Sequence, residues 1–218
     1  MDVDHRRELA RKALDGYVSG VEAPAAATAQ ALAKVGNAAT VVLVEGLSDQ
    51  IALETAALAH DRDLDAERIV VLPMGGAHAI GRFLTRFRTG PRLAGLCDLG
   101  EEEIFRRAIV AAGLGSPWTR ADLERLGFHV CVNDLEDELI RALGTAEVEA
   151  VFGTQGDLGS FRSLQSQPAW RGRDLDAQLH RFLASGSRRK LRYARLLVEA
   201  AVTRNALPRP LNALLAAL

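Results

Sequence analysis

The fold is decided by residues 40–53, which read TVVLVEGLSDQIAL. The first five residues are apolar or β-branched, as in a strand that is covered on both faces of a parallel sheet. Glu45 and Gly46 close this run. Ser48 is a candidate N-cap, and apolar residues recur at helical spacing from Ile51 onward. The stretch therefore predicts a strand followed by a helix, which is the unit from which parallel sheets are built.

The same pattern recurs three more times. Strand-like runs precede helical patterns at RIVVLPMGG (68–76), RLAGLCDLG (92–100) and FHVCV (128–132). Strands that alternate with helices predict an α/β fold, with a parallel sheet flanked by helices.

The helical patterns at the two ends of the chain lack such strands. We expect N-terminal helices over residues 1–37, an α/β core over residues 38–144 and a C-terminal helical segment over residues 145–218. In the last of these, the helical patterns are DLDAQLHRFLAS, RRKLRYARLLVEAAVTRN and PRPLNALLAAL. We expect this segment to pack on the core.

Composition excludes several classes of protein. The 218 residues are 48% hydrophobic and 25% charged, with 27 basic and 28 acidic side chains, which excludes a disordered or low-complexity chain. The charged N-terminus and the absence of a long apolar run argue against a secretory signal and a membrane span, so we expect a cytoplasmic protein. Cys97 and Cys131 are the only cysteines, which argues against a disulfide framework or a cysteine-rich zinc site.

Acidic side chains follow three of the predicted strands. Glu45 and Asp98 come directly after apolar runs, and residues 133–138 read NDLEDE. The carboxyl ends of parallel strands meet at one edge of a sheet, where ligands bind. Clustered carboxylates repel one another unless a divalent cation neutralises them. An all-oxygen set of this kind suits Mg²⁺ or Mn²⁺.

A second interpretation of some acids stays open. Acidic residues just after strands often cap helices or interact with the helix dipole. This interpretation applies to Asp49, Glu101, Glu102 and Glu103.

These residues carry a family resemblance. The segments VVLVEGLSDQIAL, LPMGG and LAGLCDLGEEE resemble the Toprim domain, in the version found in the overcoming lysogenization defect (OLD) family of nucleases. The Toprim pattern is a glutamate after the first strand and Asp-x-Asp after the third, which jointly bind Mg²⁺. In the OLD-like version the first motif often reads V-E-G-x-S-D, and a further acid and a lysine follow. The resemblance covers roughly residues 38–215.

Seven positions match these motifs: Glu45, Gly46, Ser48, Asp49, Asp98, Glu136 and Lys190. The resemblance implies that Glu45, Asp98 and Lys190 are catalytic. It also implies that the metal ligands come from Glu45, Asp49, Asp98, Glu101 and Glu136.

The sequence departs from the family pattern at two points. Gly100 stands where the second Asp of Asp-x-Asp is expected, so a ligand has been lost or its role has moved to Glu101 or Glu102. A GxxxxGK[ST] loop is absent, so we expect a Toprim protein without the ATPase domain of full-length OLD proteins. A separate ATPase and a second copy of this chain are candidate partners.

Lys190 is one of only three lysines, with Lys12 and Lys34, among 27 basic residues. In the family role, Lys190 faces the transferring phosphate as a compact positive charge. The alternative is a solvated residue in a basic helix.

Four arginines near Lys190 are candidates for nucleic-acid binding: Arg188, Arg189, Arg192 and Arg195. Residues 188, 192 and 195 share one predicted helix face and are expected to contact the phosphate backbone, unless they form a merely solvated face. Aromatic residues make up 5% of the chain, which argues against base stacking and sequence specificity. The pair Gly75-Gly76 is either a tight turn, which we favour, or a set of backbone donors for a phosphate.

Three hypotheses of function follow. The leading one is a Mg²⁺- or Mn²⁺-dependent nuclease that acts on DNA or RNA without strong sequence specificity. Because of Gly100, the alternative is a catalytically impaired Toprim protein that binds nucleic acid or has a regulatory role. A small-molecule phosphatase-like or receiver-like protein would explain the acids, but it would not explain Lys190 or the helical C-terminal segment.

Overall fold

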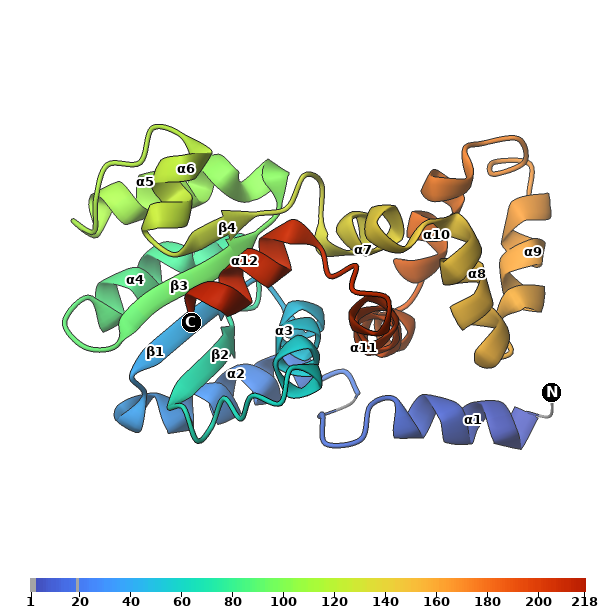
Figure 1. Ribbon diagram of the computed structural model, residues 1–218, viewed down its shortest axis with the longest axis horizontal. Helices are drawn as coiled ribbons and strands as arrows, with labels where there is room; N and C mark the ends of the chain where they lie inside the picture. The colour runs from blue at the N-terminus through green and yellow to red at the C-terminus, as the bar shows by residue number, and fades with distance from the viewer. Residues whose placement is uncertain (1–2, 19) are drawn as a thin grey trace.

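The computed structural model describes residues 3–18 and 20–218 (Figure 1). Its elements in chain order are α1 (Val3–Lys12), α2 (Ala23–Lys34), η1 (Val35–Asn37), β1 (Thr40–Val44), α3 (Leu47–Ala59), β2 (Ile69–Pro73), η2 (Ala77–Ala79), α4 (Ile80–Phe87), β3 (Arg92–Cys97), η3 (Leu99–Glu101), α5 (Glu102–Ala111), α6 (Arg120–Arg125), β4 (Phe128–Val130), α7 (Leu135–Leu143), α8 (Thr145–Thr154), α9 (Leu158–Ser166), α10 (Leu175–Leu183), α11 (Ser187–Thr203) and α12 (Arg209–Ala217).

The four predicted strands form one parallel sheet, in the order β2-β1-β3-β4. The α/β fold expected from the sequence is therefore confirmed. Strand β1 pairs with β2 on one side and with β3 on the other, so the order of the strands reverses at β1. In an open parallel sheet, the loops diverge at such a reversal and leave a crevice beyond the strand ends.

Alternating side chains of β1 build the two cores of the sheet. Val42 and Val44 point to the face that is covered by α3 and α12, whereas Val41 and Leu43 point to the face that is covered by α4, α5 and α6. All four valine and leucine side chains are fully buried. The sheet thus lies between two helical layers, as its apolar sequence predicts.

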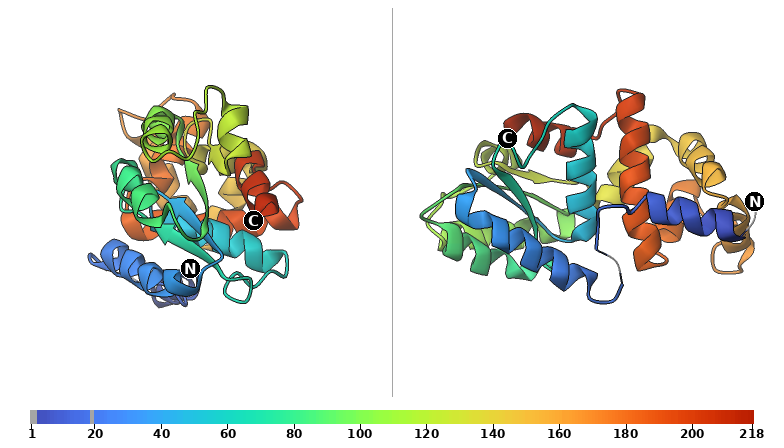
Figure 2. Two further views of the ribbon diagram at one scale, coloured as in Figure 1. Left: turned by 90° about the vertical axis from the view of Figure 1, so that its left-hand side faces the viewer. Right: turned by 90° about the horizontal axis from the view of Figure 1, so that it is seen from below.

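The helices α7 to α11 form a second body beside the sheet (Figure 1). Its centre is a cluster of four aromatic rings: Phe152, Phe161, Phe182 and Tyr193. Helix α11 lies alongside α3, which joins this body to the sheet (Figure 2, right).

The C-terminal helical patterns are confirmed as α10, α11 and α12. The structure adds α8 and α9, which the sequence had left unassigned. Helix α12 leaves the helical body and returns to the sheet, where it lies against β3 and β4. In the part of the chain that the structure describes, no helix is both long and apolar enough to cross a membrane.

Gly95 in β3 lies at a position where a side chain would collide with both neighbouring strands. A Cβ added there would lie 2.8 Å from the Leu43 carbonyl oxygen and 2.9 Å from the Phe128 ring. A Cβ at Gly100 would meet nothing within 4 Å. We expect Gly95→Ala to lower the free energy of unfolding by about 1–3 kcal/mol, because the neighbouring backbone cannot move aside. Urea unfolding measures this, and Gly100→Ala, which should cost less than ~0.5 kcal/mol, is the control. Equal losses for the two variants would contradict the close packing of β1 and β3.

Candidate functional site

The carboxyl ends of β1 and β3 open into a cleft of about 1080 Å³. Its lining includes Glu45, Asp49 and Asp98 from the sheet edge and Lys190 from the first turn of α11. The first motif with Glu45 and Asp49, the acid Asp98 and the lysine Lys190, which lie up to 145 positions apart in the sequence, therefore line one cleft. The fourth predicted part, Glu136, is not in its lining. The segment before α2 supplies apolar side chains, among them Leu14, to the same cleft.

Glu45 connects the ends of three strands. Its Oε1 accepts a hydrogen bond from the backbone N–H of Asp98 at 3.0 Å, which crosses from β1 to β3. Its backbone carbonyl accepts hydrogen bonds from the N–H groups of Gly75 and Gly76, at 3.1 and 2.9 Å, after β2. Burial raises the pKa of Glu45, and the hydrogen bond from Asp98 partly offsets this.

The glycine pair after β2 is a tight turn. Gly75 and Gly76 have φ angles of 78° and 119°, a region that side chains other than glycine rarely adopt. Their N–H groups are both bonded to the Glu45 carbonyl. The turn interpretation is therefore correct, and the backbone N–H groups of the pair fix Glu45.

Asp49 has two roles. Its Oδ2 accepts a hydrogen bond from the Gly46 N–H at 2.9 Å, so it caps α3 as the alternative interpretation proposed. The N-cap is Gly46 rather than Ser48, because α3 begins earlier than the sequence indicated. Asp49 also lines the cleft, and its burial raises its pKa to about 6 although Lys190 nearby lowers it.

Asp98 is the most strongly perturbed carboxyl group of the cleft. Burial, together with the nearby carboxylates of Glu45, Asp49, Asp134 and Glu136, raises its pKa to about 8. This is the mutual repulsion that the sequence predicted for acids gathered at one sheet edge.

Lys190 and Glu136 form an ion pair, with 3.2 Å between Nζ and Oε2. Glu136 is 7% exposed, and its burial raises its pKa while Lys190 lowers it. Burial alone would lower the pKa of Lys190, but Glu136 and Asp49 outweigh it and raise the value. The ammonium group of Lys190 therefore stays charged and is held beside the carboxylates.

The two acids after Gly100 differ in their contacts. Glu102 pairs with Arg106 and with Arg120, the latter at 3.0 Å. Glu101 lies close enough to Glu45 to raise the pKa of that residue. Of the two candidates for the missing acid, Glu101 is thus the one that remains next to the cleft.

The four arginines of α11 do not form one face. Arg188 and Arg189 line the cleft, and the Arg189 guanidinium lies 4.0 Å from the centre of the Phe182 ring. Arg192 is 8% exposed and forms an ion pair with buried Asp157, which also accepts a hydrogen bond from the Tyr193 hydroxyl at 2.9 Å.

Arg195 lies outside the cleft. It pairs with Glu199 at 2.8 Å and lies beside Tyr17 in a separate hollow. The expectation that Arg188, Arg192 and Arg195 share one nucleic-acid-binding face is therefore wrong. The body of helices α7 to α11 buries Arg192, and the sequence around α11 gives no sign of its partner at position 157.

An aspartate–histidine pair beside the cleft escaped the sequence analysis. His180 Nε2 and Asp134 Oδ2 are 2.6 Å apart, and Asp134 Oδ1 accepts a hydrogen bond from the Asp137 N–H at 2.8 Å. The hydrogen bond to Asp134 raises the pKa of His180. Asp134 is visible in the sequence as one acid of NDLEDE, but its partner on α10, 46 positions away, has no local signal.

The donor set suits a hard divalent cation in its chemistry, because it consists of carboxylate oxygens at one edge of the sheet. The raised pKa of Asp98 shows that these carboxylates lack full compensation. Within residues 3–18 and 20–218, however, no three His, Cys, Asp or Glu side chains are already arranged around a common ion position. Asp49 and Glu136 instead contact Gly46 and Lys190.

Comparison with known proteins agrees with this architecture. Residues 38–89 match the family model described as the TOPRIM domain of overcoming lysogenization defect-like proteins. The chain contains a Toprim domain that resembles the one in OLD proteins.

Solved structures extend the likeness beyond this match. The C-terminal region of the Burkholderia pseudomallei OLD protein is 20% identical, with a TM-score of 0.54, over 83% of this chain and 96% of that one. A structure of the corresponding region from Xanthomonas campestris pv. campestris is 22% identical, with a TM-score of 0.58, over 84% of this chain and 93% of that one. At these identities the likeness establishes the fold. No curated protein matches the chain.

The Toprim carboxylates make a prediction about stability. An unfolded aspartate loses its proton near pH 3.9, whereas Asp98 in the folded chain keeps its proton up to about pH 8. Between these values the folded state binds more protons than the unfolded state, so the contribution of Asp98 to stability falls as the pH rises. In EDTA, we expect Asp98→Asn to melt a few degrees above the parent protein at pH 8 and at the same temperature at pH 4. Thermal unfolding measures both. Asp15→Asn, at an exposed site, is the control, and a difference that does not depend on pH would contradict the crowding of carboxylates.

Proposed function

We propose that this chain is a metal-dependent nuclease that hydrolyses phosphodiester bonds in DNA or RNA. The observation that carries the proposal is the meeting of Glu45, Asp98 and Lys190 in one cleft beyond the carboxyl ends of β1 and β3. Acids alone at this edge would also suit a phosphatase or a receiver. A lysine contributed from a distant helix adds a positive charge where a phosphate would lie.

The ion in this proposal is Mg²⁺ or Mn²⁺. Glu45 and Asp98 are its proposed ligands, and Asp49, Glu101 and Glu136 are further oxygen donors within the same group of acids. When bound, such an ion lowers the pKa of a coordinated water and neutralises the charge that develops on the phosphate and the leaving oxygen. A cation there would also remove the repulsion that raises the pKa of Asp98.

The chain's own cations complete the site. Lys190 supplies a compact ammonium group for the transferring phosphate, and Glu136 positions it through their ion pair. Arg188 lies on the same wall of the cleft and is suited to contacts with backbone phosphates, whereas the Arg189 guanidinium is stacked on Phe182 and donates to the Phe182 carbonyl oxygen. These contacts ignore base identity, in keeping with a nuclease that lacks strong sequence specificity.

The alternative function is a catalytically impaired Toprim module that binds nucleic acid or regulates a partner. Gly100 favours it, because the second Asp of the family motif is missing. Glu101 favours the nuclease, because it places another carboxylate beside Glu45. The two functions differ in whether bound nucleic acid is cut.

The decisive experiment is cleavage of plasmid and single-stranded DNA, and of RNA, with Mg²⁺ or Mn²⁺. We expect cleavage that EDTA abolishes and that Glu45→Gln reduces below detection. Lys190→Arg should lower the rate nearly as much as Lys190→Ala, about 10²–10³-fold, because a planar guanidinium does not replace an ammonium at a point contact. Affinity for the nucleic acid, measured without metal, should change little.

The matched control is Arg195→Ala, which removes a cation from the same helix outside the cleft. It should cleave like the parent protein. Binding of nucleic acid without cleavage under any of these conditions would favour the impaired module. Full activity of Lys190→Arg would show that position 190 requires only a positive charge and not an ammonium group.

Gly100→Asp separates the two functions in a different way. The position has room for a side chain, so the substitution should not disturb folding. If Glu101 supplies the missing acid, the cleavage rate of Gly100→Asp should stay within about threefold of the parent, less than 1 kcal/mol in the barrier. Gly100→Asn, which has the same size without the charge, is the control. A gain of more than about tenfold, seen only for Asp, would show that the natural site is impaired.

A further inference from the structure

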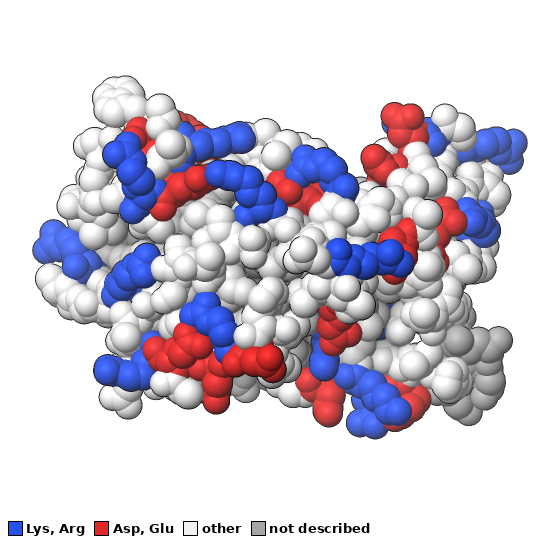
Figure 3. Space-filling model, in the orientation of Figure 1, with Lys and Arg blue, Asp and Glu red and all other residues white. Residues whose placement is uncertain are grey.

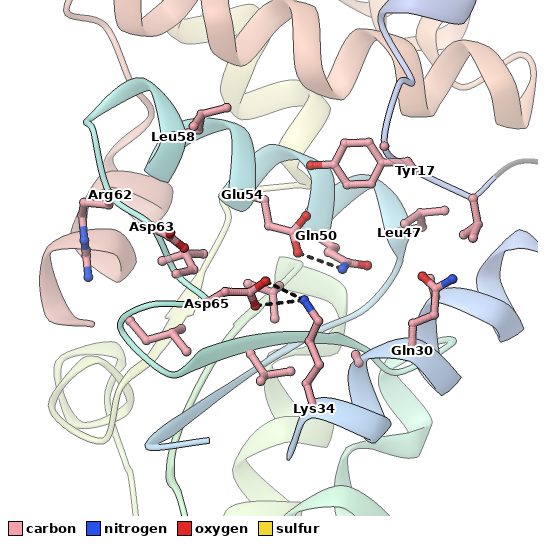
Figure 4. Close-up of a pocket in the computed structure, with 18 of the residues that line it drawn as sticks. Tyr17, Gln30, Lys34, Leu47, Gln50, Glu54, Leu58, Arg62, Asp63 and Asp65 are labelled. Carbon is pink, nitrogen blue, oxygen red and sulfur yellow. Dashed lines mark hydrogen bonds and ion pairs between the residues drawn. The ribbon is translucent and has the colours of Figure 1, made fainter. Parts of the chain in front are cut away.

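A second hollow lies along α3 and shares Leu47 with the cleft (Figure 4). It has a volume of about 690 Å³ and is walled by α2, α3, β2, the loop after α3 and the segment that carries Tyr17. This size suits a small organic molecule. The proposed nuclease mechanism uses none of its polar side chains.

The inner end of this pocket is rich in hydrogen-bond acceptors. Gln50 Nε2 donates to Glu54 Oε1 at 2.8 Å. Gln50 Oε1 is buried and accepts no hydrogen bond from the residues that the structure describes. Among those same residues, Glu54 forms no ion pair. A partly buried carboxylate without a directly paired cation is unfavourable, so this part of the pocket has room for a cationic group.

The basic side chains of the pocket are already engaged. Lys34 Nζ lies 2.9 and 2.8 Å from the two carboxylate oxygens of Asp65, as the dashed lines in Figure 4 show. Arg62 pairs with Glu67 and donates to the Leu215 carbonyl oxygen at 2.6 Å. Neither Lys34 nor Arg62 forms an ion pair with Glu54, although the charge of Lys34 lowers the pKa of Glu54 from a distance.

The mouth of the pocket is acidic as well. Asp61 and Asp63 are exposed there, and neither forms an ion pair with another described residue. Figure 3 shows acidic side chains gathered over the loop between α3 and β2. The pocket thus has acids at its inner end and at its mouth.

Much of the remaining lining is apolar. Val18, Ala27, Ala31, Leu47 and Leu64 contribute this surface. A fully hydrated metal ion would gain nothing from such walls, whereas an alkyl chain would bury its surface against them. The complementary molecule has an apolar stem and cationic ends.

We propose that this pocket binds a small aliphatic amine, with an ammonium group against Glu54 and the stem along the apolar wall. In a diamine, the second ammonium group lies at Asp61 and Asp63. An ammonium donates charge-assisted hydrogen bonds, which suits the carboxylate of Glu54 in the pocket lining. The proposal is independent of the nuclease function.

The electrostatics of Glu54 agree with this arrangement. Burial raises its pKa, although hydrogen bonds from Gln50 and Tyr17 lower it. Its carboxylate is thus poorly compensated by the protein alone. A bound cation would restore the charged form.

Calorimetric titration of the metal-free full chain with putrescine, butylamine and butanol tests the proposal. We expect putrescine to bind more tightly than butylamine, and butanol to give no saturable binding. Glu54→Gln, which keeps the shape of the side chain, should weaken both amines at least about tenfold, as loss of a charged hydrogen bond predicts. Glu103→Gln, which removes an exposed acid far from the pocket, should leave both affinities unchanged.

A second variant tests the mouth of the pocket. Asp63→Asn keeps the ability to accept the hydrogen bond from the Ala66 N–H and removes the charge. It should weaken putrescine several-fold and leave butylamine unchanged.

Several results would overturn the proposal. They are no binding of putrescine to the parent protein, unchanged affinity in Glu54→Gln, an equal loss in Glu103→Gln, or butanol that binds as well as butylamine. Equal effects of Asp63→Asn on both amines would overturn the place assigned to the second ammonium group. None of these outcomes depends on nuclease activity, so failure of one proposal leaves the other intact.

Discussion

The hydrogen bond from the Asp98 N–H to the Glu45 carboxylate is the contact on which the site depends. It is possible only because β1 and β3 are adjacent and parallel, so that their ends emerge side by side. The backbone of Glu45 meanwhile holds the turn after β2 through two N–H groups. One residue therefore connects the loops after β1, β2 and β3, two of which carry acids of the cleft. The remaining repulsion among these acids is the chemical reason to expect a cation there.

A second constraint brings the positive charge to these acids. Lys190 lies 145 positions after Glu45, and only the packing of α11 along α3 places it in the cleft. That packing relies on the helical body, where Phe152 contacts three other aromatic rings and the Arg192–Asp157 pair is buried. The helical body therefore holds the ammonium group of Lys190 in the cleft. A buried ion pair within it adds little net stability but penalises any arrangement that separates the two charges.

The sequence predicted those features of the fold and site that depend on residues close together in the chain. The four strands follow from continuous apolar runs, and the placement of Glu45 and Asp98 follows from parallel strand geometry alone. The assignment of Lys190 needed the family motif, because nothing near it in sequence indicates its partner. Arg192 and His180 were misjudged or missed for the same reason: their contacts, Asp157 and Asp134, lie 35 and 46 positions away. Helix periodicity identifies which residues share a face, but it does not say whether that face meets solvent or another helix.

Helix α3 lines both sites: Asp49 lies in the cleft, Glu54 lies in the second pocket, and Leu47 lines both. This arrangement sets how strongly their occupants can influence each other. At a separation of about 10 Å, a single and a double positive charge repel by ~0.8 kcal/mol in water and by ~3 kcal/mol at the effective dielectric of about 20 that describes protein sites. Ordering of α3 by either ligand cannot reverse this repulsion to any large extent, because its first turn is already capped by Asp49 and its length is packed against α11. We therefore expect the two sites to be antagonistic, with an amine in the second pocket weakening the binding of a metal ion in the cleft, and the reverse.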